Sequence, residues 1–209
     1  MNDEPPSLPE CAVGRRIAIW GVTGSGKSTL GKALGGILDV PVVELDAIRH
    51  ERGWESVDWP EFRSRLESSL ETSTGGWVVE GGYSAIMDVY LSKIDTLIWL
   101  RLPLYTTFPR LVTRCVRRIR SKDPLYGPDG PRESARMTFA SRESILLYSL
   151  TTHRSVVAAR RERLKEVPPG VRKIELTSAR AVEGFLDRLR SSTRIEAVGS
   201  RRSHGAPDA

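Results

Sequence analysis

The sequence has few cysteines and histidines, and it lacks any long apolar run. Its 209 residues include 2 cysteines, Cys11 and Cys115, and 3 histidines. Cys11 falls in a predicted flexible arm, Cys115 falls in a predicted helix, and the histidines lack metal-ligand spacing, so we expect neither a disulfide framework nor a His/Cys metal centre. No stretch approaches the roughly 18 consecutive apolar residues that a membrane span needs. We therefore expect a soluble, cytoplasmic protein with no membrane partner.

The positive charge is concentrated in the second half of the chain. The formal net charge is +6, yet residues 1–100 carry 9 Lys/Arg against 15 Asp/Glu, whereas residues 101–209 carry 23 against 11. Clustered Arg and Lys side chains attract polyanions. Charge alone is therefore compatible with a nucleic acid or with a nucleoside triphosphate.

Short apolar runs alternate with helical periodicity along the chain. This pattern predicts βαβ units, a mainly parallel sheet and ligands beyond the carboxyl ends of the strands. The segment "SKDPLYGPDGPRES" continues neither element and predicts a mobile loop. The predicted strands are 15–21, 40–45, 77–81, 96–102 and 172–177, and the predicted helices are 27–38, 59–72, 84–94, 106–120, 135–165 and 179–191.

One motif predicts a phosphate-binding loop. The stretch "GVTGSGKS" matches G-x-x-x-x-G-K-[ST] and lies between a predicted strand and a predicted helix, as that motif requires. Glycines let such a loop wrap phosphate oxygens, and the following helix offers free N–H groups at its positive end. Lys27 is expected to reach the β and γ phosphates, and Ser28 to bind Mg²⁺. The predicted ATP-binding residues are Gly21, Val22, Thr23, Gly24, Ser25, Gly26, Lys27, Ser28 and Thr29.

Two other nucleotide-binding patterns are incomplete. Thr29 interrupts the G-x-G-x-x-G pattern of dinucleotide-binding proteins and protein kinases. Asn2 is the only asparagine, so the Asn-Lys-x-Asp motif that reads guanine in GTPases is absent. ATP is therefore favoured over GTP.

Several further stretches carry a resemblance to a known group of proteins. These are "GVTGSGKSTL", "PVVELDAI", "WPEF", "WVVEGGYS", "DTLIWLRLP" and "RLVTRCVRRIR". With them the chain resembles adenylate-kinase-like P-loop kinases, specifically the DNA topology modulation (FlaR-like) family, most closely over residues 15–120. The resemblance implies an α/β P-loop NTPase three-layer sandwich. Its five-stranded parallel sheet has the order 2-3-1-4-5, with helices on both faces and an arginine-bearing helical lid. Such proteins more commonly show Asp-Gly-Asn-Tyr where this chain has "EGGY", so Glu80 is one methylene longer.

Two carboxylates follow neighbouring strands of the predicted sheet. Asp46 follows the second strand, where it would orient or deprotonate an acceptor hydroxyl or support Mg²⁺; the alternative is a helix N-cap. Glu80 lies at the end of the third strand, where it would hold a magnesium-bound water and complete the metal site with Ser28; the alternative is a solvated or salt-bridged side chain. Gly81 and Gly82 would let an acceptor approach the backbone closely.

Arginines are expected to bind the anionic groups. Arg114 and Arg118 share one face of the predicted helix 106–120, and we expect both to contact the transferring phosphate. Arg49 and Arg52, just after Asp46, would anchor an anionic acceptor. Solvated faces are expected for most members of a further basic group, which consists of Arg117, Arg120, Arg160, Arg161 and Arg163.

The sequence thus predicts a kinase that uses ATP and Mg²⁺ to phosphorylate a small-molecule acceptor, such as a nucleoside monophosphate or another small anion. The alternative is a nucleic-acid-associated regulatory P-loop ATPase of the topology-modulation type, which the basic half favours although it lacks a base-reading motif. The expected organisation is a disordered arm over 1–14, one domain over 15–192 with a lid at about 121–142, and a disordered tail over 193–209. Acceptor identity and oligomeric state stay open.

Overall fold

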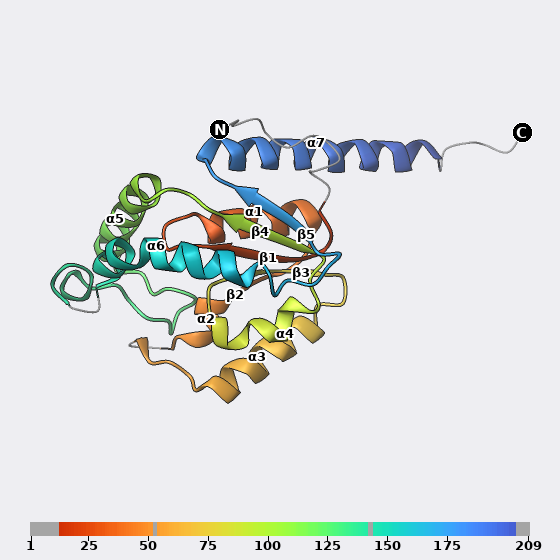
Figure 1. Cartoon of the computed structure of the whole chain (residues 1–209). Helices are drawn as coiled ribbons and strands as arrows, with labels where there is room; N and C mark the ends of the chain where they lie inside the picture. The colour runs from red at the N-terminus through yellow and green to blue at the C-terminus, as the bar shows by residue number, and fades with distance from the viewer. Residues whose placement is uncertain (1–12, 52–53, 142–143, 204–209) are drawn as a thin grey trace, which may run out of the picture.

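A five-stranded parallel sheet forms the centre of the structure, with helices on both faces (Figure 1). The computed structural model describes residues 13–51, 54–141 and 144–203. The strand order is β2-β3-β1-β4-β5, and every neighbouring pair is parallel, which confirms the predicted sheet. The strands are β1 Arg16–Gly21, β2 Val42–Glu44, β3 Trp77–Glu80, β4 Thr96–Leu100 and β5 Arg172–Leu176.

Strand β1 shows why the sheet is covered on both sides. Its side chains alternate between two core clusters. Ile17 and Ile19 belong to the cluster formed with α1 (Lys27–Leu38) and α7 (Ala179–Ser203). Ala18 and Trp20 belong to the cluster formed with α3 (Trp59–Glu71) and α4 (Met87–Leu91). Burying both faces yields the three predicted layers. The helices and helical turns are α1 Lys27–Leu38, α2 Leu45–Arg49, α3 Trp59–Glu71, η3 Ser84–Ile86, α4 Met87–Leu91, α5 Leu104–Ser121, η4 Arg136–Ala140, α6 Ile145–Arg163 and α7 Ala179–Ser203.

Local capping decides where several elements begin. Asp58 caps α3 by accepting a 2.8 Å hydrogen bond from the backbone N–H of Glu61. The predicted helix 135–165 is divided, because Ser144 caps α6 with bonds from the N–H groups of Leu146 and Leu147 and separates it from the π-helical turn η4. The predicted helix 84–94 likewise forms η3 followed by α4.

The C-terminal end of the described chain is helical further than the sequence predicted. Helix α7 continues to Ser203, so the segment from residue 193, expected as a disordered tail, begins as helix. The stretch "TRIEAV" contains no proline and extends the periodicity of the preceding residues, which favours helix continuation. Residues 1–12 of the predicted arm and 204–209 of the predicted tail lie outside the described residues. Within the described chain, no helix is long and apolar enough to cross a membrane.

Candidate active site

The loop between β1 and α1 has the geometry of a phosphate cradle. Gly24 and Gly26 adopt φ angles of 79° and 96°, in the left-handed region that favours glycine. A Cβ atom at residue 24 would lie 2.4 Å from the carbonyl oxygen of Thr107, so α5 leaves no room for a side chain there. The first turn of α1 contains no acidic residue. Its free N–H groups and positive dipole end therefore face the loop, and none of them is capped by an acidic side chain of that turn.

Lys27 begins α1 and is half-buried beside two carboxylates. Its ammonium donates a 3.2 Å hydrogen bond to the backbone carbonyl of Val22, inside the loop. Burial lowers the pKa of Lys27, while the negative charges of Glu80 and Asp46 oppose that shift. An arriving phosphate would add negative charge beside this ammonium and favour its charged form.

Ser28 and Glu80 form the candidate metal site. The Ser28 hydroxyl donates a 2.6 Å hydrogen bond to Oε1 of Glu80, whose side chain is only 4% exposed. Burial raises the pKa of Glu80, and the charge of Lys27 and the Ser28 hydroxyl act in the opposite direction. Hydroxyl and carboxylate oxygens are ligands that Mg²⁺ prefers, so Ser28 at the start of α1 and Glu80 at the end of β3 suit a magnesium ion shared with phosphate oxygens. The longer glutamate side chain thus does reach the serine.

Asp46 lies in the first turn of α2 rather than at the end of a strand. Strand β2 ends at Glu44, which also occupies the N-cap position of α2, so the N-cap interpretation of Asp46 is wrong. The carboxylate of Asp46 instead accepts a 2.7 Å hydrogen bond from the Tyr83 hydroxyl. The hydroxyl oxygen of Tyr83 also lies 3.0 Å from Nε2 of His50. The other ring nitrogen of His50, Nδ1, lies 3.2 Å from the hydroxyl oxygen of Ser56.

The donor count sets the direction of this hydrogen-bond chain. An ionised carboxylate only accepts, so Tyr83 donates its single proton to Asp46. His50 then donates from Nε2 to Tyr83, and its Nδ1 accepts from Ser56. Burial lowers the pKa of His50, which favours the neutral ring that this arrangement requires. The chain of hydrogen bonds holds Oδ1 of Asp46, and among the described residues Oδ2 has no hydrogen-bond partner, so it is available to a ligand.

Two cavities meet at the phosphate-binding loop. The larger has a volume of about 510 Å³ and includes Ser28, Glu80, Arg114 and Arg118 in its lining. The smaller, about 310 Å³, lies between the loop, Gly81, Gly82 and helix α6. Four residues line both cavities: Thr23, Lys27, Asp46 and Tyr83. The ammonium of Lys27 and the carboxylate of Asp46 therefore lie where the two cavities join.

The predicted arginines separate into two groups. Arg114 and Arg118 of α5 line the larger cavity, and Nε of Arg114 is buried without a hydrogen-bond partner within the described part of the chain. Arg49 does not line either cavity; its guanidinium stacks 4.3 Å above the ring of Trp59. Arg52 lies outside the described residues.

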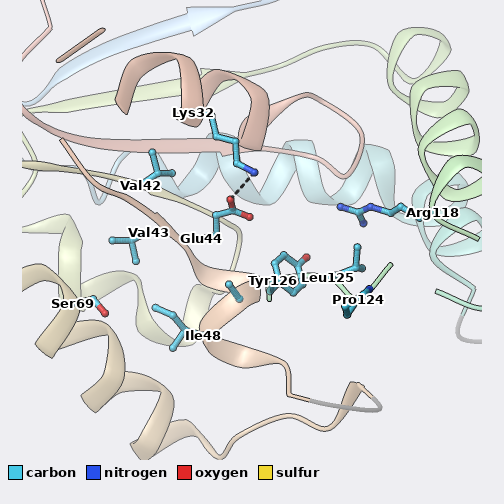
Figure 2. A pocket seen from close by; sticks show the side chains of 11 residues that line it. Lys32, Val42, Val43, Glu44, Ile48, Ser69, Arg118, Pro124, Leu125 and Tyr126 are labelled. Carbon is cyan, nitrogen blue, oxygen red and sulfur yellow. Dashed lines mark ion pairs between the residues drawn. The ribbon is translucent and has the colours of Figure 1, made fainter. Parts of the chain in front are cut away.

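The predicted lid loop is docked over the larger cavity. The indole N–H of Trp54 donates a 3.0 Å hydrogen bond to the carbonyl of Arg132, and Arg118 lies 3.7 Å from Oε1 of Glu133. Figure 2 shows Pro124, Leu125 and Tyr126 of this loop beside a third hollow of about 600 Å³, with Ile48 and β2 across it. The Lys32–Glu44 ion pair, 3.1 Å long, borders the same hollow.

Four residues of the site were not assigned a role from the sequence. Arg160, expected on a solvated face, is 6% exposed and lines the smaller cavity with His153, while Tyr83 and His50 hold Asp46. Gly81 and Gly82 line that cavity too, but packing explains them as well: a Cβ at residue 81 would lie 2.6 Å from Cβ of Leu45, and one at residue 82 would lie 2.8 Å from Nη2 of Arg160.

Comparison with known proteins points to kinases. No protein-family model matches the chain. Shikimate kinase of Actinobacillus pleuropneumoniae serotype 5b (strain L20) is 28% identical over 129 residues, which cover 57% of this chain and 73% of that protein. Shikimate kinase of Histophilus somni (strain 2336) is 29% identical over 132 residues, with the same coverage of 57% and 73%.

A solved structure has the same fold. Shikimate kinase from Acinetobacter baumannii in complex with shikimate aligns with a TM-score of 0.50 and 14% identity, covering 96% of this chain and 100% of that one. At this identity the likeness concerns the fold alone. The sheet order, the complete phosphate-binding loop and the sequence relatives together define an ATP-dependent P-loop kinase.

Proposed function

We propose that the chain transfers a phosphoryl group from ATP, with Mg²⁺, to a hydroxyl group of a small-molecule acceptor. The observation that carries this proposal is the meeting of the two cavities at Lys27 and Asp46. Phosphoryl transfer requires a donor and an acceptor in line, with charge neutralised between them. The larger cavity, which contains Ser28 and Glu80, suits ATP with its metal ion, and the smaller cavity that joins it suits the acceptor.

The loop residues 21–29 would bind the ATP phosphates in the larger cavity. Ser28 and Glu80 would hold Mg²⁺, which neutralises charge on the phosphate oxygens when it is bound. Lys27 would neutralise charge on the transferring phosphate, and Arg114 and Arg118 would donate hydrogen bonds to it from α5. The buried, unpartnered Nε of Arg114 supports a ligand contact at that position.

The acceptor would occupy the smaller cavity, against Gly81 and Gly82. The free oxygen of Asp46 would accept the proton of the attacking hydroxyl, while Tyr83 holds the other oxygen at 2.7 Å. The cavity volume of about 310 Å³ suits a small metabolite. The shikimate kinase relatives support a small hydroxy acid as the first candidate, and nucleoside monophosphates remain the candidates from the sequence resemblance.

An acceptor screen tests the proposal. Purified protein would be incubated with Mg-ATP and, separately, with shikimate and with each nucleoside monophosphate, and ADP release would be followed. We expect one acceptor to raise ADP release well above the rate with ATP alone, and Lys27→Ala to abolish that increase. A folded Lys27→Ala protein with undiminished turnover would overturn the assignment of the loop.

The nucleic-acid-associated ATPase and the narrower resemblance to the topology-modulation family remain predictions from the sequence alone. The relatives described above are kinases of a small molecule, and they lend no support to a nucleic-acid partner. Duplex DNA added to the same ADP-release assay separates the two functions, because only the alternative expects DNA to change the rate.

A further inference from the structure

Arg160 is a buried cation in the wall of the smaller cavity. Its guanidinium donates a 2.5 Å hydrogen bond from Nη2 to the carbonyl of Gly82 and contacts the sulfur of Met87 at 3.5 Å from Nη1. It also lies 5.3 Å from the centre of the Trp20 ring. Each of these partners is neutral, although the side chain is only 6% exposed. Burying a charge without an opposite charge nearby costs free energy, so this site lacks an anionic partner for Arg160.

The neighbouring arginine on α6 shows the contrast. Arg163 also contacts the Met87 sulfur, at 3.9 Å, but it pairs with the carboxylate of Glu166 at 3.5 Å. Among the described residues, no carboxylate is hydrogen-bonded to or ion-paired with Arg160. The carboxylate that does line the smaller cavity, Asp46, is already bound by Tyr83. The cavity therefore contains two cations, Lys27 and Arg160, and one carboxylate.

His153 supplies a second unsatisfied group in the same cavity. Its Nδ1 atom is buried and lacks a hydrogen-bond partner within the described part of the chain. Burial lowers the pKa of His153, so the ring is neutral near pH 7 and can accept or donate one hydrogen bond. A ligand hydroxyl would satisfy it.

We propose that Arg160 is the anchor for an oxyanion of the acceptor, which is therefore a small hydroxyl compound bearing a carboxylate or a phosphate ester. This inference rests on the proposed function and refines it. Ser28, Glu80 and Arg114 line the larger cavity and Arg160 does not, so the anion at Arg160 belongs to the acceptor rather than to ATP. The guanidinium has the planar donor geometry that carboxylates and phosphates match. Arg160 thus takes the role that the sequence suggested for Arg49.

Binding measurements with Mg-ADP present test this subsite. Saturating Mg-ADP occupies the phosphate-binding loop, and the protein is then titrated with glycerate, glycerol 3-phosphate and glycerol, which differ in the anionic group. Melting temperature and dissociation constant are read for the wild type, Arg160→Gln, Arg160→Lys and the control Arg163→Gln. Arg160→Gln removes the charge and leaves a shorter polar amide, whereas Arg160→Lys retains the charge without the planar donor group.

We expect at least one of the two anions to bind the wild type and Arg163→Gln, and glycerol not to bind. Arg160→Gln should bind that anion about 10- to 100-fold more weakly, the loss expected for a hydrogen bond to a charged group, and Arg160→Lys should retain part of the affinity. The stronger anion identifies carboxylate or phosphate as the acceptor group.

Equal anion affinity in Arg160→Gln and wild type, or no binding of either anion to the wild type, would overturn the subsite. If Arg160→Gln does not fold, Gly82→Ala displaces the guanidinium without removing its charge and is expected to weaken anion binding similarly. Failure of Mg-ADP itself to stabilise the wild type would instead contradict the proposed kinase function.

Discussion

Ser28 and Glu80 are 52 residues apart in the sequence, yet the serine hydroxyl donates a 2.6 Å hydrogen bond to the glutamate. Parallel pairing produces this contact, because β3 lies next to β1 with Glu80 in register with Ile19, close to the loop that leads into α1. Glu44 of β2 is in register with Glu80 on the other side, but it pairs with Lys32. Two glutamates at neighbouring strand ends thus have different partners.

Glu80→Gln should raise the Mg²⁺ concentration needed for half-maximal turnover about 10- to 100-fold, because a neutral amide supports a metal-bound oxygen more weakly than a carboxylate. Magnesium titrations of ADP release measure the change, and nucleotide binding without metal should be unaffected. Glu44→Gln is the matched control and should leave the Mg²⁺ requirement as in the wild type. An unchanged requirement in Glu80→Gln would remove Glu80 from the metal site.

Asp46→Asn should lower kcat by about 10² to 10⁴, the range for a positioned general base, with little change in ATP affinity. Tyr83→Phe leaves the carboxylate in place but removes the 2.7 Å hydrogen bond that orients it, so we expect a smaller loss. Separate titrations of ATP and acceptor distinguish the effects. Full kcat in Asp46→Asn would exclude Asp46 from catalysis, and a loss confined to ATP binding would make it a metal-site residue.

Residues 121–134 should become more protected from hydrogen exchange when nucleotide and acceptor are both bound, because phosphate contacts at Arg118 would add to the bond between Trp54 and the Arg132 carbonyl. Exchange followed by mass spectrometry measures this. Trp54→Phe removes the indole donor and should increase exchange in the free protein. The lid prediction fails if protection in this segment is the same with and without ligands.

The protein should lose stability as the pH falls below about 6.5. Burial lowers the pKa of both His50 and His153 below the ordinary value of 6.5 in the folded state. Between the folded and unfolded pKa values the unfolded chain binds more protons, so the stabilisation is complete above about pH 6.5 and declines below it. Each histidine contributes at most about 1.4 kcal/mol per pH unit.

Urea unfolding between pH 7.5 and 5.5 measures this decline. The double variant His50→Gln/His153→Gln should show a shallower dependence on pH than the wild type. Identical slopes for the two proteins would mean that other groups cause the change.

Local sequence patterns were sufficient to predict the strands, the phosphate-binding loop and most of the helices. Strands β1, β3, β4 and β5 lie within one or two residues of prediction. Strands β1, β3 and β4 are short runs buried on both faces, whereas β5 alternates buried and exposed side chains. Short-range rules failed where a few residues form an element, as with α2, or where one capping serine divides a helix, as at Ser144. The order of the strands in the sheet was predicted from the family resemblance, and the structure confirms that order.

The identity of the loop motif and the candidates Lys27, Ser28, Asp46 and Glu80 were determined by the sequence alone, because strand-end positions in a parallel sheet converge on one edge. Only the tertiary structure decided which arginine is buried. Arg160 and Arg161 are adjacent in the same basic run, but successive residues of α6 point in different directions. Arg160 therefore reaches the carbonyl of Gly82, whereas Arg161 is exposed. Side-chain pairing across distant elements is invisible to periodicity, which is why the Tyr83–Asp46 contact and the cavity behind it emerged only from the fold.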